Sequence, residues 1–133
     1  MAPLSIFDIS GRAMAAQLVR LNTIASNLAN AGSVAGSPDA AYRARKPVFA
    51  TMLDGASRAT VDVERVVAAG AEPERRHDPN HPLANADGDV WAAAVDVNQE
   101  MVEMIETSRQ YQNNVEVMST AKTLMLDTLR LGK

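Results

Sequence analysis

The C-terminal third of the chain carries the hydrophobic pattern that most constrains its fold. Ten positions from Val97 to Leu129 alternate steps of four and three residues without a slip, and eight of these ten are apolar or aromatic. A 3.5-residue period kept over this length is typical of a coiled-coil seam. Asp96 supplies an N-cap and Gly132 a stop. The sequence therefore predicts a C-terminal helix of about 35 residues within the segment 96–132.

The N-terminal segment shows the same kind of pattern over a shorter span. Ser5 and Asp8 have the spacing of a capping box, with the N-cap side chain three residues before an acidic partner. Apolar residues then recur every seven positions, at Phe7, Met14, Leu21 and Leu28. This stripe predicts an N-terminal helix within the segment 5–31.

The segment 32–95 between the helices differs from them in composition and in hydrophobic pattern. Residues 46–53 and 60–67 are short β-rich runs, and the residues 54–58 between them have turn chemistry, so the sequence predicts a β-hairpin. The rest is dense in Pro, Gly, Asn and Asp and is expected to form an extended loop. The predicted fold is one domain over residues 1–133, mainly α with a small β part. Its long N- and C-terminal helices pair as a coiled coil around a central β-hairpin and extended loop.

Composition argues against several classes of function. The chain has 13 basic and 16 acidic side chains without long blocks of one sign, whereas nucleic-acid binding needs clustered Lys and Arg. The absence of cysteine excludes disulfides and thiol chemistry. The longest uncharged run, residues 21–38, is interrupted by Asn, Ser and Gly, so no membrane insertion is expected. The first ten residues lack a basic region, so no cleaved secretory signal is expected either.

The candidates for catalytic or metal chemistry are weak. His77 and His81 flank Asp78, but the neighbouring prolines oppose the helix that would aim both rings at one ion. Neither a nucleophile elbow nor a Gly-rich phosphate loop occurs. Glu100 and Glu103 lie at the start of the predicted helix, where its dipole already accounts for acidic residues. We therefore expect no metal, no cofactor and no enzymatic activity.

Two features suggest packing against another chain. Four methionines lie on the long seam, which fits either a core or an adaptable binding face. Uncharged amides lie beside the stripes, and they either serve a crowded interface or merely fray the helix end. From the residues alone, a self-assembling subunit competes with a small helical adaptor that binds one client helix through its Met-rich seam.

Three sequence motifs resemble one known family. The stretch "RLNTIASNLANA", followed by "YRARKPVF", resembles the N-terminal signature of the bacterial flagellar axial proteins, which form the rod, hook and hook-associated structures. Residues 95–133 are similar to the C-terminal signature of that family. The middle motif "HPLANADG" and the short chain most resemble its proximal-rod members.

The resemblance implies a structural role in the flagellar basal body. Family members are exported unfolded through the flagellar type III apparatus, and their terminal helices line the inner layer of a tubular rod that crosses the periplasm. The implied partners are other rod subunits and copies of the chain itself. The expected assembly interface comprises apolar and amide residues of both helices and one tyrosine between them: Phe7, Met14, Leu21, Asn22, Asn27, Leu28, Asn30, Tyr42, Met101, Met104, Tyr111, Val115, Met118, Met125 and Leu129.

Overall fold

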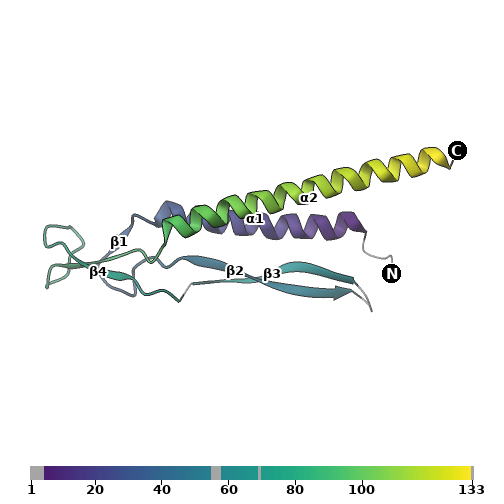
Figure 1. Ribbon diagram of the computed structural model, residues 1–133. Coiled ribbons are helices and arrows are strands. Elements are labelled where there is room, and N and C mark those ends of the chain that lie inside the picture. Colours follow the sequence, from purple (N-terminus) through teal and green to yellow (C-terminus); the bar gives the residue numbers. More distant parts are fainter. Residues whose placement is uncertain (1–4, 55–57, 69, 133) are drawn as a thin grey trace.

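The computed structural model describes residues 5–54, 58–68 and 70–132. Two long helices lie side by side and antiparallel along a β-hairpin, and a second group of strands lies at one end of this elongated molecule (Figure 1). The elements are α1 (Ile6–Asn30), β1 (Val34–Ala35), β2 (Arg45–Asp54), β3 (Arg58–Ala68), β4 (Glu74–His77), β5 (Asp89–Ala92) and α2 (Val97–Leu131).

Both helices begin at the predicted caps. The Ser5 hydroxyl accepts a hydrogen bond from the Asp8 amide at 3.2 Å, and the Asp8 carboxylate accepts one from the Ser5 amide at 3.0 Å. The Ser5 amide and, at 2.9 Å, the Ser5 hydroxyl both lie within hydrogen-bond distance of the Asp8 carboxylate, and these two contacts hold the pKa of Asp8 below its ordinary value of 3.8 because they favour the ionised form. Asp96 caps α2 by accepting from the Gln99 amide at 3.2 Å, and Gly132 ends it. The predicted capping and the 35-residue length of α2 are thus confirmed.

The predicted hairpin is also present. Strands β2 and β3 pair antiparallel over their whole length, from Arg45 opposite Ala68 to Asp54 opposite Arg58. The register shifts between Val48 and Phe49, so one residue is left unpaired in the ladder there. Residues 55–57 of the predicted turn lie outside the described residues.

The expectation of a mainly α fold with a single central hairpin was wrong. Beside the two helices, the described residues form five strands in two antiparallel sheets. Part of the expected extended loop forms a three-stranded sheet of order β1-β5-β4. The sequence hides these strands because all four residues of β4 are exposed, so no alternation of apolar and polar residues marks it, and β5 has only four residues. Val90, at the centre of this sheet, is fully buried.

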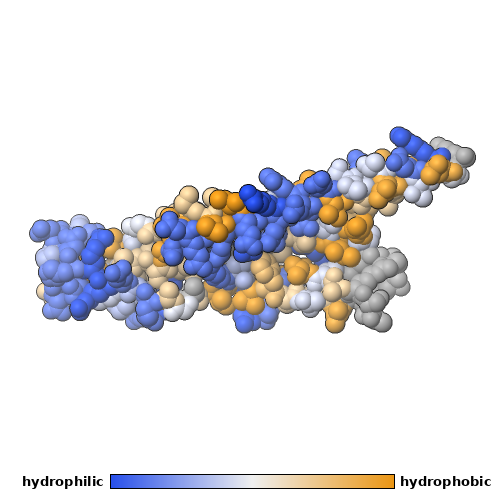
Figure 2. Space-filling view, in the orientation of Figure 1, coloured by the Kyte–Doolittle hydropathy of each residue, from blue (hydrophilic) through white to orange (hydrophobic). Residues whose placement is uncertain are grey.

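The buried core of the described residues is small. It contains five hydrophobic residues, and three of them are alanines. By contrast, nineteen large hydrophobic side chains among the described residues are exposed, eleven of them on α2. Figure 2 shows hydrophobic residues along the middle of the molecule and on the projecting end of α2, whereas hydrophilic residues gather at the opposite end. The chain alone therefore leaves much apolar surface in water, which is typical of a protein that is buried further by association.

None of the described helices has a stretch long and apolar enough to cross a lipid bilayer.

Candidate assembly interface

Most of the residues that the two helices bury are small or polar. Ser10 and Ala16 of α1 and Thr107 of α2 are buried, and the Gln17 side-chain amide donates to the Gln110 side-chain oxygen across the pair at 2.8 Å. The two helices therefore bury few of the large apolar residues that mark them in the sequence.

The predicted seam of α2 only partly coincides with its buried face. Met104, Tyr111 and Met118 are half-buried, whereas Met101 is 48% exposed and Val115 is 46% exposed. The fully buried positions, Glu100 and Thr107, belong to a neighbouring row of the helix. The structure thus divides the expected seam into one row that faces the rest of the chain and one row that faces solvent.

The predicted stripe of α1 is half-buried at its four main positions, Phe7, Met14, Leu21 and Leu28. Leu18, on the same side of the helix, is 45% exposed. The most deeply buried apolar residue of α1 is instead Ile24, which is 2% exposed. The large apolar residues of α1 therefore keep surface that a neighbouring molecule could cover.

Asn27 has a role within the chain that its helical position did not reveal. Its side-chain oxygen accepts from the Arg45 amide and from the Tyr42 hydroxyl, both at 2.8 Å, and its amide donates to the Arg45 carbonyl at 2.9 Å. The residue is 1% exposed. Asn27 thus joins the end of α1 to the start of β2, and Tyr42 is part of the same network.

The other two asparagines of the expected interface differ from Asn27. The Asn30 side chain donates to the Ser26 carbonyl at 2.8 Å, within the last turn of α1. Asn22 is exposed and lines a shallow hollow with Val66 of β3. Of the three, Asn22 is the one whose side chain remains open to a partner.

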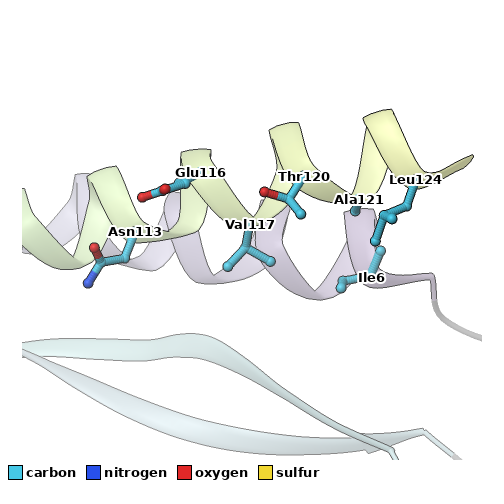
Figure 3. Close-up of a pocket in the computed structure, with 7 residues that line it drawn as sticks. All are labelled: Ile6, Asn113, Glu116, Val117, Thr120, Ala121 and Leu124. Carbon is cyan, nitrogen blue, oxygen red and sulfur yellow. The ribbon is translucent and has the colours of Figure 1, made fainter. Parts of the chain in front are cut away.

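The projecting end of α2, residues 122–131, is exposed at every position. It runs past the start of α1 (Figure 1). An open groove of about 490 Å³ lies where it begins, and Figure 3 shows Ile6 of α1 approaching Leu124 there. The apolar residues of the projecting end are exposed by 44–87%: Leu124, Met125, Leu126, Leu129 and Leu131. So many exposed apolar side chains on one helix end are expected to be covered, at least on one face, by another molecule.

Sequence reasoning missed one charged cluster. Lys46, at the start of β2, lies 2.6 Å from a Glu103 oxygen and 3.6 Å from a Glu100 oxygen. The two chain segments meet because the Ala44 amide donates to the Ala94 carbonyl at 3.1 Å, just before α2 begins. The helix dipole explained the glutamates in the sequence, so nothing there pointed to a lysine more than fifty residues away.

The two histidines lie apart from the helices. The His77 ring is 3.0 Å from an Asp89 oxygen, and the His81 ring accepts from the Leu83 amide at 3.1 Å.

Replacing both histidines by Gln should change the free energy of unfolding by no more than about 0.5 kcal/mol per site, because these are surface contacts. Urea unfolding of the free chain and micrographs of assembled structures measure the outcome. Loss of a bound metal together with loss of assembly would instead identify the pair as ligands.

Comparison with known proteins gives matches at both ends of the chain and along its whole length. Residues 7–36 match the family described as flagella basal body rod protein, and residues 86–131 match the C-terminal family of the FlgEFG flagellar basal body rod proteins. A relative named flagellar basal-body rod protein FlgC from Salmonella typhimurium is 47% identical over the full length of both chains. Relatives of the same name from Escherichia coli O157:H7 and from the Buchnera aphidicola of Acyrthosiphon pisum are 48% and 38% identical, again over both full lengths.

Proposed function

Because this chain belongs to the FlgC family of flagellar basal-body rod proteins, we propose that it assembles through the exposed faces of its two terminal helices. The chain is a structural subunit of the flagellar basal-body rod. The observation that carries the proposal is the projecting end of α2, whose five large apolar side chains are exposed in the free chain. Complete burial of an exposed Leu or Met side chain stabilises a complex by about 1.5–3 kcal/mol, so covering these side chains favours assembly.

The position within the basal body and the partners follow from the same reasoning. We place the subunit in the proximal part of the rod, which the "HPLANADG" motif and the short chain support. Its partners are copies of itself and other rod subunits in a tubular assembly that transmits rotation for motility. The exposed rows of α1 and α2 face these partners, with Met101, Val115, Met125 and Leu129 at the contact.

Export through the flagellar type III apparatus is part of the proposal. A core of two branched aliphatic residues and three alanines gives the free chain little stability against unfolding. A chain of this kind is easily kept unfolded for passage through a narrow conduit, and it gains its stability on assembly. The proposed role requires neither catalysis nor a cofactor.

The experiment that tests the proposal removes the apolar character of the projecting end. Leu124→Ser combined with Leu129→Ser should leave the free chain folded, because both side chains are 63% exposed there. Cells carrying the double variant should export the protein at near-normal levels and yet lack complete rods and motility. Electron micrographs of isolated basal bodies measure the result.

A matched control is available in the same segment. Thr123→Ser combined with Thr128→Ser keeps the hydroxyls that bond the Ser119 and Leu124 carbonyls and leaves the leucines in place. Rods should then form normally. Normal rods from the leucine double variant, together with loss of one defined complex, would favour the adaptor function instead.

A further inference from the structure

A second pocket lies at the opposite end of α2, where the start of this helix meets the strands. Its volume is about 510 Å³, and its walls include the alanines Ala44, Ala71, Ala93 and Ala94. These short side chains form the apolar part of the pocket lining. The pocket belongs neither to the helix pair nor to the projecting end of α2.

The charged residues that line this pocket are mostly acidic. Glu72, Glu74, Asp96 and Glu100 face a single cation, Lys46, so the lining carries four negative charges and one positive charge. Arg43 lies 3.2 Å from Glu72 and offsets one of these charges from outside the lining. The pocket therefore retains a negative potential that attracts a cation.

Glu100 supplies the specific feature. Its side chain is 3% exposed, and one carboxylate oxygen, Oε1, lies 3.6 Å from the Lys46 ammonium. The other oxygen, Oε2, is buried and has no hydrogen-bond partner among the described residues. Burying a carboxylate oxygen without a hydrogen-bond donor costs free energy. A donor supplied by another molecule would therefore stabilise Glu100. Lys46 does not supply such a donor, since its shortest contact, at 2.6 Å, is to Glu103.

We propose that the pocket receives an arginine side chain from a neighbouring rod subunit. The alanine walls hold its aliphatic stem, and its guanidinium donates to Glu100 while Lys46 stays with Glu103. Arginine fits better than lysine because its planar fork delivers several donors and is more weakly hydrated. A metal ion fits less well, since the described residues contain no group of three or more His, Asp or Glu side chains arranged to hold one. This inference rests on the proposed function, because the arginine comes from another rod subunit.

The first test uses the purified chain and a small probe. N-acetyl-arginine amide, titrated by NMR, should shift the amide signals of Ala71, Ala94 and Gln99, whereas the neutral isostere N-acetyl-citrulline amide should not. Glu100→Gln should weaken the binding of the arginine probe about tenfold or more. Glu106→Gln, an exposed change on the same helix outside the pocket, should leave it unchanged. Equal binding of the two probes, or undiminished binding to Glu100→Gln, would overturn the proposal.

The second test examines assembly in cells. Glu100→Gln should reduce the number of rods in isolated basal bodies about tenfold, and Glu106→Gln should leave that number unchanged. Ala71→Leu, which narrows the pocket at an exposed wall residue and leaves Glu100 in place, should give the same loss if Glu100→Gln itself fails to fold. Normal rods with Ala71→Leu, or with a folded Glu100→Gln chain, would refute the pocket proposal. If the pocket variants form normal rods while the Leu124→Ser and Leu129→Ser double variant does not, the pocket proposal fails and the proposed function stands.

Discussion

Val115→Glu should leave the free chain folded and prevent rod assembly. Val115 is 46% exposed on α2, so a carboxylate there reaches water as long as the chain is free. In the proposed assembly this row is covered by a neighbour, and burying an unpaired carboxylate costs several kcal/mol. Cells should therefore export the variant at near-normal levels but lack complete rods, hooks and motility, as seen in electron micrographs of basal bodies.

Gln112→Glu serves as the control for Val115→Glu. It adds the same charge one turn earlier, at a position that is already polar and exposed. Rods should still form in this variant, because no apolar contact is lost. Intact rods built from Val115→Glu protein would show that this row of α2 lies outside the interface.

Of the substitutions proposed for the free chain, Asn27→Ala should cause the largest decrease in the free energy of unfolding. The change removes three hydrogen bonds and leaves the amide and carbonyl of Arg45 without their partner in a place where Asn27 is 1% exposed. Each unsatisfied buried group costs about 1–3 kcal/mol, so we expect a decrease of about 3 kcal/mol or more in the free energy of unfolding. Urea unfolding followed by circular dichroism measures it.

Two further variants separate the contributions to this network. Tyr42→Phe removes the hydroxyl that donates to Asn27 and that also lies 3.2 Å from the Ser26 hydroxyl, so it should cost about 1–2 kcal/mol. Asn22→Ala, at an exposed position of the same helix, should stay within about 0.5 kcal/mol of the parent chain. If Asn27→Ala were as stable as Asn22→Ala, the hydrogen bonds of Asn27 would contribute little to the fold.

Local features of the sequence determined the helices, their caps and the hairpin. Ser5 with Asp8 and Asp96 with Gln99 act over three residues, and the strands of the hairpin are joined by a short connection. Such contacts depend on neighbours in the chain, so spacing and residue type suffice to predict them. The family signatures at the two ends were readable for the same reason, since each lies within one continuous stretch.

Only the tertiary structure decided which rows of the helices are buried and what the strands between them do. Periodicity gives the apolar positions of a helix, but it does not tell which of two adjacent rows meets its own chain and which meets a neighbour. Strand β4 is polar throughout and becomes a strand because β5 supplies its hydrogen-bond partners. The bonds of Asn27 to Arg45 and of Lys46 to Glu103 likewise join residues far apart in sequence. These contacts form only when the folded chain brings the partners together. The sequence around each residue does not contain that distance, so local patterns cannot predict them.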